Sequence, residues 1–378
     1  MYKPKLLIFI DWYKPGFKAG GPIRSISNLV DAIADQLDIY IITRDTDYLE
    51  TEPYTTIKSN QWNNIDGAKV YYLSKENQNL KSIKKLLIEV NPDQLYCNCL
   101  YSPIFTQLPL YLANKLKIKS IIAVRGMLSQ GSLGVKSTKK KVFLVLAKII
   151  GQYKNTIFHA TTLDEKNDIE AVFGKATKLI VAQNLPENKH ILFHEKSKEN
   201  NSLKIVSIGR IAPEKNTLYA IEVLLHVKSQ ITLDIYGAIY KQDYWNKCLT
   251  VIKKLPSNIT VNYKSILEHQ KINNTLKNYH VLFLPSTGEN FGHAIIEGMI
   301  NSCIPVISDK TPWKNLLKQQ VGFDISLDKI EDFAKTIDLI SSFTPIEFNT
   351  FSKNAHHYAA KIIDDKELVL KYLELFKP

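Results

Sequence analysis

The chain has few cysteines and no long apolar run. Its first apolar stretch, residues 6–10, is five residues long, and no other stretch approaches the ~18 apolar residues that a membrane-spanning helix needs. A secretory signal peptide also needs a longer apolar run, so neither a leader nor a span is predicted. None of the four cysteines forms a CxxC pair, and all of them lie within or beside apolar segments. We expect buried free thiols in a reducing cytoplasm.

Acidic residues are missing from one long window. Between Asp93 and Asp164 the sequence has ten Lys or Arg and no Asp or Glu, within a chain of net charge +12. Inside this window, residues 136–151 (KSTKKKVFLVLAKIIG) predict a helix with a basic start and a strongly apolar body. Two interpretations stay open: a core helix with a solvated charged end, or a surface that meets anionic lipid or a diphosphate-bearing substrate. No RNA- or DNA-binding motif accompanies the charge, so nucleic acid is not expected as a partner.

A GxGxxG motif is also missing after the first predicted strand, so a dinucleotide fingerprint is not supported. The loop instead carries Gly20 and Gly21, with a helix predicted to begin near Pro22. Two glycines allow the backbone to approach an anion or a sugar closely at the start of this helix. A plain tight turn explains them equally well.

The chain does have a regular alternation of strand and helix patterns. Apolar runs predict strands at 5–10, 39–43, 68–73, 94–99, 119–124, 156–161 and 178–182 and, after a polar interruption, at 203–209, 231–236, 259–263, 280–285 and 304–308. Helical segments lie between most of them, which indicates parallel sheets covered on both faces. We predict an α/β protein with two doubly wound, Rossmann-like domains that face each other across a cleft.

The polar stretch 186–202 divides the two series of strands and is the predicted linker. The first domain is expected at 1–185 and the second at 203–357, with a C-terminal helix at about 358–378 that packs back onto the first domain. Ligands of such folds bind at the carboxyl ends of strands, so the loops at those ends are the candidate sites.

One such loop, after strand 280–285, holds two acids eight residues apart. Glu289 precedes a helix predicted from about His293, and Glu297 lies one turn inside that helix. The free N–H groups near Phe291, Gly292 and His293 would meet a diphosphate. Glu297 would then accept hydrogen bonds from ribose hydroxyls, and Glu289 from hydroxyls of a sugar beyond the phosphates. Stabilisation of the helix start is an alternative for Glu289, but Glu297 lies too deep for it.

The loop after strand 203–209 carries two cations, Arg210 and Lys215. A guanidinium and an ammonium that leave the same strand end would together neutralise a diphosphate. Taken alone, two basic residues in a loop are usually solvated, and the acidic pair nearby is what favours the binding role.

Together these segments resemble glycosyltransferase family 4, the retaining enzymes with the GT-B fold. The resemblance is carried by Glu289 and Glu297 in PSTGENFGHAIIEG, by Arg210 and Lys215 in SIGRIAPEKN, and by residues 304–313 (IPVISDKTPW). The segments KAGGPIRS at 18–25 and VRGML at 124–128 are similar to the branch that builds bacterial capsule, exopolysaccharide and lipopolysaccharide.

The resemblance implies a hexosyltransferase that moves a sugar from a UDP- or GDP-linked donor to a growing, lipid-linked surface glycan, without a required metal or other cofactor. It implies a donor site on the second domain, an acceptor site on the first, and a cytoplasmic protein held peripherally at the anionic inner face of the membrane. The catalytic residues would be Arg210, Lys215 and Glu289, and the donor would also meet Gly21, Arg125, Gly209, Asn290, Phe291, Gly292, His293 and Glu297.

Three positions depart from the family pattern. Ser302 stands where a glycine commonly precedes the Pro-Val segment, which is tolerable if its backbone torsion is ordinary. Arg125 lies in the loop where many relatives carry a histidine that contacts the donor sugar, and it is a candidate substitute. Residues 262–265 (NYKS) replace a glycine near the base and leave the nucleotide open.

Two other functions compete with this one. Asp45 and Asp47 form a DxD, which metal-dependent transferases of another fold use to bind a divalent ion, here on an expected surface loop. A non-catalytic protein that kept the nucleotide-sugar pocket is the second alternative, and the presence of Arg210, Lys215 and Glu289 argues against it.

Overall fold

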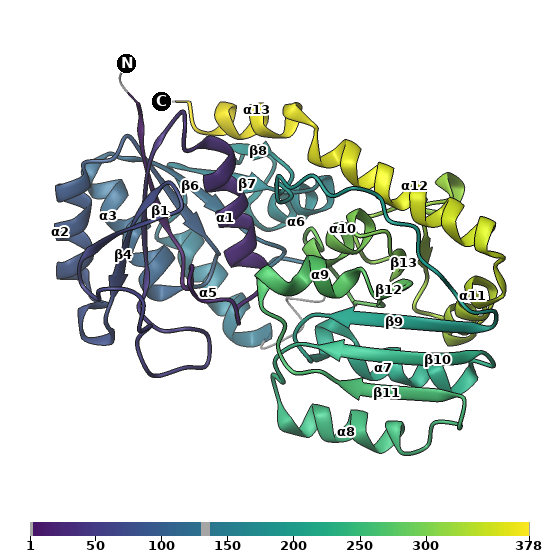
Figure 1. Ribbon diagram of the computed structural model, residues 1–378. Coiled ribbons are helices and arrows are strands. Elements are labelled where there is room, and N and C mark those ends of the chain that lie inside the picture. The colour runs from purple at the N-terminus through teal and green to yellow at the C-terminus, as the bar shows by residue number, and fades with distance from the viewer. Residues whose placement is uncertain (1–2, 130–136, 378) are drawn as a thin grey trace. The chain divides into compact units, whose positions relative to one another are not determined.

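A computed structural model describes residues 3–129 and 137–377, and the chain divides into two compact units. Unit 1 comprises Met1–Asn188 with Asp365–Pro378, and unit 2 comprises Lys189–Asp364. Part of the polar stretch 186–202 packs on unit 2, where the buried Lys196 ammonium donates to the Leu276 carbonyl at 3.2 Å. Figure 1 shows the strands and helices of both units.

Unit 1 is built on an eight-stranded sheet in the order β3-β4-β2-β1-β5-β6-β7-β8. The strands are β1 (Lys5–Phe9), β2 (Asp38–Arg44), β3 (Trp62–Ile65), β4 (Ala68–Leu73), β5 (Gln94–Asn98), β6 (Lys119–Ala123), β7 (Thr156–Ala160) and β8 (Leu179–Val181). All neighbours are parallel except β3 and β4. In β1, Leu7, Ile8 and Phe9 are fully buried, as expected for a parallel strand covered on both faces.

The helices of unit 1 connect these strands, except for α13, which follows unit 2 in the chain. They are α1 (Gly21–Ile33), α2 (Leu80–Val90), α3 (Leu108–Leu116), α5 (Ser137–Ile149), α6 (Leu163–Phe173) and α13 (Lys366–Leu375), with short turns at Lys75–Asn77 and Pro103–Gln107. Polar caps fix three of the helix starts: Asn79 accepts from the Ser82 N–H, Thr162 from the Glu165 N–H, and Asp365 from the Glu367 N–H. The last helix, α13, contacts α1.

Unit 2 is built on a six-stranded, all-parallel sheet in the order β11-β10-β9-β12-β13-β14. Its strands are β9 (Ser202–Ile208), β10 (Gln230–Tyr236), β11 (Ile259–Tyr263), β12 (Val281–Leu284), β13 (Ile304–Ser308) and β14 (Phe323–Ile325). Its helices are α7 (Thr217–Val223), α8 (Gln242–Ile252), α9 (Ile272–Leu276), α10 (His293–Ile300), α11 (Ile330–Ser342) and α12 (Pro345–Ile363), with short turns at Pro213–Lys215, Leu224–His226, His269–Lys271 and Leu317–Gln319. Thr344 and Glu347 form a capping box at the start of α12.

The predicted fold class is confirmed: every predicted strand is present within one or two residues of its expected bounds. Two short edge strands escaped prediction. Two of the four residues of β3, WNNI, are asparagines and none of the four is buried, and β14 has three residues, so neither forms a recognisable apolar run. No helix of the described residues is long and apolar enough to cross a membrane. All four cysteines are free, and burial raises the pKa of Cys248 to about 11.

Ser302 has a left-handed backbone, with φ of 63°, rather than an ordinary torsion. It follows α10 in a Schellman motif, in which the Cys303 N–H bonds the Gly298 carbonyl and the Ser302 N–H bonds the Met299 carbonyl, both at 2.9 Å. Glycine is preferred at this position because a Cβ in the left-handed region costs about 1–2 kcal/mol. The serine therefore carries local strain at the end of α10.

Ser302→Gly should raise the free energy of unfolding by up to about 1 kcal/mol, because it relieves that strain. Two losses reduce the gain: glycine makes the unfolded chain more flexible, and the 3.5 Å hydrogen bond from the His194 N–H to the serine hydroxyl disappears. Urea denaturation measures the change. Ser207→Gly, in the buried strand β9 and without a positive φ, is the matched control and should lower stability. A Ser302→Gly variant less stable than the parent would show that the hydroxyl outweighs the torsion.

Candidate functional site

The loops after β9 and β12 meet at one edge of the unit 2 sheet, because these strands are parallel neighbours. The Thr287 N–H of the second loop donates to the Glu214 carbonyl of the first at 3.0 Å, and the Thr287 hydroxyl donates to the same oxygen at 3.2 Å. The two loops are thus fixed to each other by the backbone, before any of their charged side chains is considered.

Lys215 and Glu289 form an ion pair between these loops. The Lys215 ammonium lies 2.6 Å from Oε1 and 2.8 Å from Oε2 of Glu289, and the Ser286 hydroxyl donates to Oε1 at 2.7 Å. The side chain of Glu289 is 8% exposed and that of Lys215 is 23% exposed. A pair that is largely shielded from water is held more firmly than a surface salt bridge.

Arg210 has a carboxylate partner of its own. Its Nη2 donates to Oε1 of Glu214 at 3.1 Å, and its guanidinium carbon lies 5.8 Å from the centre of the Tyr240 ring. This pair is more open to water, with side-chain exposures of 34% and 45%. Both predicted catalytic cations therefore leave the end of β9 with an acid beside them.

Gly237 allows the end of β10 to approach the end of β9 closely. Its φ is 154°, and a Cβ at this position would lie 1.8 Å from the Gly209 carbonyl oxygen, so no other residue fits without a shift of the backbone. The Gly209 N–H donates to the Tyr236 carbonyl at 2.9 Å. A Cβ on Gly209 would contact the stem of Lys215 at 3.5 Å, so the lysine side chain lies over this glycine.

The start of α10 supplies backbone donors at the same edge. Gly292 caps the helix with φ of 78°, and a Cβ there would lie 2.7 Å from Ile295 Cδ1. Phe291 is buried, and its carbonyl accepts from the Trp313 indole at 2.5 Å. His293 is the first helical residue and contacts the Phe291 ring, and Asn290 lies just before it. Helix N-termini of this kind attract anions.

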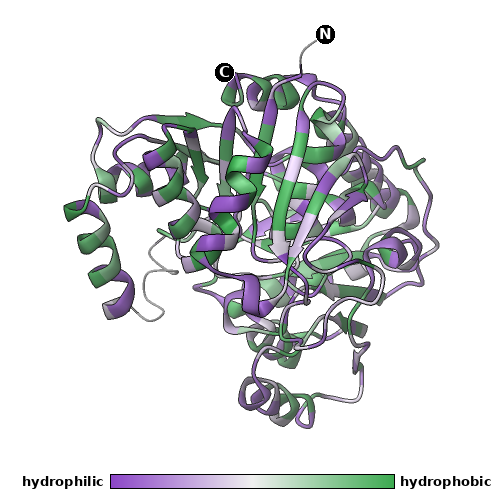
Figure 2. Ribbon diagram, turned by 90° about the vertical axis from the view of Figure 1, so that its left-hand side faces the viewer, coloured by the Kyte–Doolittle hydropathy of each residue, from purple (hydrophilic) through white to green (hydrophobic). Residues whose placement is uncertain are grey.

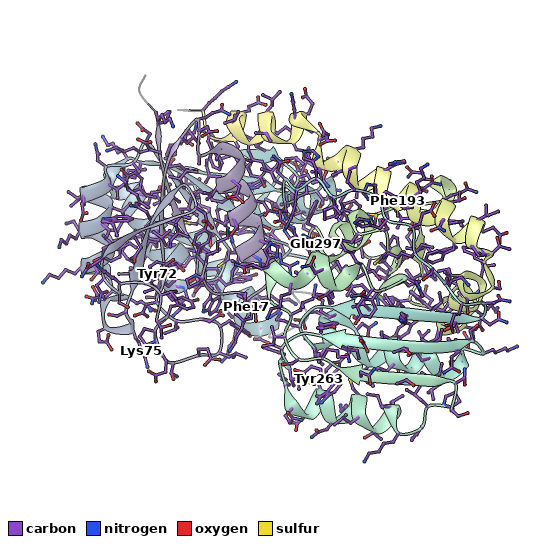
Figure 3. All side chains as sticks on the ribbon, in the orientation of Figure 1. Phe17, Tyr72, Lys75, Phe193, Tyr263 and Glu297 are labelled. Atoms are coloured by element: carbon purple, nitrogen blue, oxygen red, sulfur yellow. The ribbon has the colours of Figure 1, made fainter. Side chains whose placement is uncertain are left out.

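Glu297 lies inside α10 and is 7% exposed (Figure 3).

The loop after β11 reaches the same sheet edge: the Tyr263 hydroxyl donates to the Gly237 carbonyl at 3.1 Å, and the Gly237 N–H donates to the Ser265 carbonyl at 2.8 Å. The ammonium of Lys264 lies 3.7 Å from Asp234. Residues 262–265, left open by the sequence, thus line the edge that carries Gly209 and Gly237.

Gly21 belongs to unit 1 and begins α1, directly after Gly20, whose φ is 73°. A Cβ on either glycine would meet no atom within 4 Å, so the backbone is open to an approaching group here. The predicted contact of Gly21 with a phosphate stays a prediction.

Arg125 is held by its own unit. Its Nε donates to Asn98 at 2.6 Å, its Nη1 to Asn184, and its Nη2 to the Tyr96 hydroxyl at 2.9 Å. The chain of hydrogen bonds continues through His159, whose Nε2 lies 2.7 Å from the Ala182 carbonyl and must donate to it, so Nδ1 accepts from Tyr96. Burial lowers the pKa of His159 to about 3, in keeping with a neutral ring. Arg125 thus joins the ends of several strands, and its predicted contact with the donor stays untested.

The DxD residues Asp45 and Asp47 are buried rather than on an open surface loop. Asp47 accepts from the Phe17 N–H at 3.1 Å and the Lys18 N–H at 3.3 Å, and Asp45 accepts from the Ser59 hydroxyl at 2.8 Å. These hydrogen bonds give both carboxylates a structural role in the loops after β1 and β2.

Comparison with known proteins places this geometry in a family context. Residues 188–357, which cover most of unit 2, match the family of glycosyl transferases group 1. The crystal structure of Anabaena HepE in complex with UDP and glucose superposes with a TM-score of 0.74 at 17% identity, over 98% of this chain and 99% of that one. The fold is GT-B. Sucrose-phosphate synthase from Thermosynechococcus elongatus gives a TM-score of 0.73 at 14% identity, over 99% of this chain and 98% of that one.

A curated relative matches over a shorter stretch. The GtfA subunit of the UDP-N-acetylglucosamine–peptide N-acetylglucosaminyltransferase of Streptococcus agalactiae is 28% identical over 120 residues, which is 31% of this chain. The match spans 22% of the length of that relative. The family match and the GT-B neighbours together support a glycosyltransferase.

Sequence reasoning missed two residues of this edge. Ser286 fixes the Glu289 carboxylate, and Gly237 makes room for Gly209. The signal for Gly237 was available, since it follows strand 231–236 directly and a glycine at a strand end often marks a close backbone approach. No sequence pattern distinguishes Ser286 from an ordinary loop serine.

Glu289→Gln should tighten the binding of a nucleoside diphosphate by about three- to tenfold. The substitution removes the anion that competes for the Lys215 ammonium while keeping the shape of the side chain. Titration calorimetry with UDP and with GDP measures the affinity. Glu214→Gln is the matched control: it frees Arg210 in the same way, but its pair is more exposed, so the gain should be smaller. Weaker nucleotide binding by Glu289→Gln would contradict the competition.

Proposed function

We propose that this protein is a retaining glycosyltransferase that transfers a hexosyl group from a nucleotide-sugar to a lipid-linked surface glycan of the capsule or lipopolysaccharide type. No resident metal or other cofactor takes part. The acceptor lies on unit 1, and the protein acts at the anionic inner face of the cell membrane. Support for the finer parts of this proposal comes from the sequence resemblance to family 4 and from the basic window in unit 1.

The observation that carries the proposal is the meeting of Lys215 and Glu289 at the start of α10. A cation for a diphosphate and an acid for a sugar hydroxyl are adjacent at one sheet edge, with the N-terminus of α10 beside them. A salt bridge with only a structural role would not need the close backbone contact between Gly209 and Gly237 beside it. This combination suits a ligand that has a diphosphate joined to a polyol.

The proposed chemistry is electrostatic. The diphosphate leaves from the anomeric carbon, and Arg210, Lys215 and the α10 N-terminus stabilise the charge that develops on it. The acceptor hydroxyl attacks on the face that the diphosphate leaves, and a phosphate oxygen takes its proton, so the new bond has the configuration of the old one. Glu289, once Lys215 turns toward the diphosphate, accepts hydrogen bonds from hydroxyls of the transferred sugar.

UDP is the preferred candidate for the donor nucleotide, with GDP as the second. HepE, which shares the fold, was crystallised with UDP and glucose and with UDP-glucose. We assign Glu297 to the ribose hydroxyls, because it is a buried acid one turn inside α10, beyond the N–H groups that would hold the phosphates. Gly21, Gly209, Asn290, Phe291, Gly292 and His293 would complete the donor site.

The two alternative functions are a DxD metal-dependent transferase and a non-catalytic binding protein. A DxD metal site would need the carboxylates of Asp45 and Asp47, which already accept hydrogen bonds from their own loops. A binding protein without activity would hold the same donor with the same acids, so turnover is what separates it from an enzyme. The assay below distinguishes these cases.

Arg210→Ala and Lys215→Ala should each lower turnover about 10²-fold or more, since each removes a preorganised donor to the leaving diphosphate. Product formation from UDP- and GDP-sugars, with acceptor or with water, measures the loss. Both variants should keep the unfolding transition of the parent, which shows that the substitutions do not disrupt the fold. In a separate test, the parent enzyme should keep its activity in excess EDTA. Lys253→Ala, at an exposed lysine after the end of α8 in the same unit, is the control and should leave turnover unchanged. Near-normal turnover in either variant would remove that residue from the role, and strict dependence on Mg²⁺ or Mn²⁺ would revive the DxD site.

A further inference from the structure

The basic helix of unit 1, α5, docks on the core by one narrow face. Leu144 and Ala147 are buried in the unit 1 core, and the Phe143 ring packs at 5.4 Å against Tyr101. The ammonium of Lys140 lies over the same tyrosine ring at 5.5 Å. These four residues account for the inner side of the helix, so the other apolar residues of the segment must lie elsewhere.

Those other apolar residues form an exposed stripe along α5. Their exposed fractions are 54% for Val142, 55% for Val145, 55% for Leu146, 75% for Ile149 and 71% for Ile150. The Ile150 N–H still bonds the Leu146 carbonyl at 3.0 Å, so the helical pattern continues to this residue. The spacing of i, i+3, i+4, i+7 and i+8 places all five on one side of a helix with about 3.6 residues per turn.

Lysines border this stripe. At about 100° per residue, Lys141 and Lys148 fall along one margin of it, and Lys139 lies in the first turn on the outer side. All three are exposed. No acidic residue occurs anywhere from Gln94 to Leu163, so nothing in the surrounding sequence neutralises them. Figure 2 shows the helix beside the grey trace, with a hydrophilic first turn and a hydrophobic body.

We propose that this outer face of α5, which we call the apolar stripe (Val142, Val145, Leu146, Ile149 and Ile150), inserts into an anionic lipid bilayer and anchors unit 1 to the membrane. A core helix would bury this face, and a solvated helix would not carry five large apolar residues on it. Of the bordering lysines, Lys139 and Lys141 can extend their ammonium groups toward the negative charge of anionic headgroups, while the Lys148 ammonium lies 5.7 Å from the centre of the Phe173 ring. Amphipathic helices of this composition lie in the plane of the membrane interface.

The anchor rests on the proposed function only in that a lipid-linked acceptor makes a membrane the expected partner. The direction of α5 also determines which end of unit 1 lies near the membrane. Because β6 and β7 are parallel neighbours, the helix between them runs opposite to the strands, and its first turn lies toward their carboxyl ends. Lipid-linked acceptors would be presented at that edge of unit 1, so the anchored helix holds the acceptor edge near the bilayer surface.

Vesicle binding tests the anchor with the full chain. The probes are vesicles of phosphatidylcholine alone and of phosphatidylcholine and phosphatidylglycerol in equal parts. Replacing Val145, Leu146 and Ile149 together by Ser should lower binding to the mixed vesicles at least about tenfold, because it removes most of the inserted apolar area. The matched control replaces Ile88, Leu163 and Leu370, which are 59%, 69% and 53% exposed in unit 1, and should bind as the parent does.

A second set of variants separates charge from insertion. Replacing Lys139, Lys141 and Lys148 by Gln should lower binding to the mixed vesicles about tenfold or more but leave binding to neutral vesicles unchanged. Its control replaces Lys81, Lys84 and Lys85, which are exposed on α2, and should have little effect. Circular dichroism and UDP titration confirm that each variant remains folded.

Three results would overturn the anchor. The first is a parent protein that ignores both kinds of vesicle, and the second is a serine variant that binds as the parent does. The third is a parent that sediments as a dimer which the serine variant disperses, since the stripe would then join two copies of the chain. If the protein binds vesicles but no nucleotide, the anchor is supported and the proposed donor site is wrong. If it binds nucleotide but no vesicles, the donor site is supported and the anchor is wrong.

Discussion

The ion pair between Lys215 and Glu289 depends on the order of the strands in unit 2. The two residues are 74 positions apart in the chain, and they meet because β9 and β12 are parallel neighbours whose carboxyl ends share one edge. The Gly209–Gly237 approach then brings a third strand end to the same place. A site that binds a diphosphate needs cations and N–H groups from several segments at once, and a parallel sheet provides them without long loops. The acidic partner of each cation keeps the unliganded edge close to neutral.

That neutrality has a consequence for the proposed reaction. A cation pair without acidic partners would hold a nucleoside diphosphate tightly before and after transfer. With Glu289 beside Lys215, the diphosphate must displace an existing ion pair, so part of its binding energy goes into freeing the acid for the sugar. The product nucleotide has lost the sugar that would occupy Glu289, and re-formation of the ion pair then favours its release. One contact thus serves both binding of the donor and departure of the product.

Most of the fold was predictable from the sequence, because buried parallel strands appear as short apolar runs between helical patterns. The meeting of Lys215 and Glu289 followed from motif positions at the ends of two such strands. Their direct contact did not, since a sequence places side chains near an edge but does not pair them. The left-handed torsion of Ser302 was left open by the sequence, because a glycine commonly stands at this position while serine usually has an ordinary backbone. The hydrogen bonds of Arg125 include one to a residue 59 positions away, which no local pattern reveals.

The basic helix shows a different kind of limit. Its sequence allowed a core helix or a surface helix, because an amphipathic pattern does not tell which face the core will take. The structure buries Leu144 and Ala147 and exposes the apolar stripe, which excludes the core helix with only its charged end in water.

The most direct test of the account is a crystal structure of the protein with UDP. We predict that the Lys215 ammonium leaves Glu289 and lies within hydrogen-bond distance of a phosphate oxygen, with Glu297 on the ribose hydroxyls and the diphosphate at the start of α10. A nucleotide bound elsewhere, or bound here while the Lys215–Glu289 pair remains unchanged, would contradict the central claim.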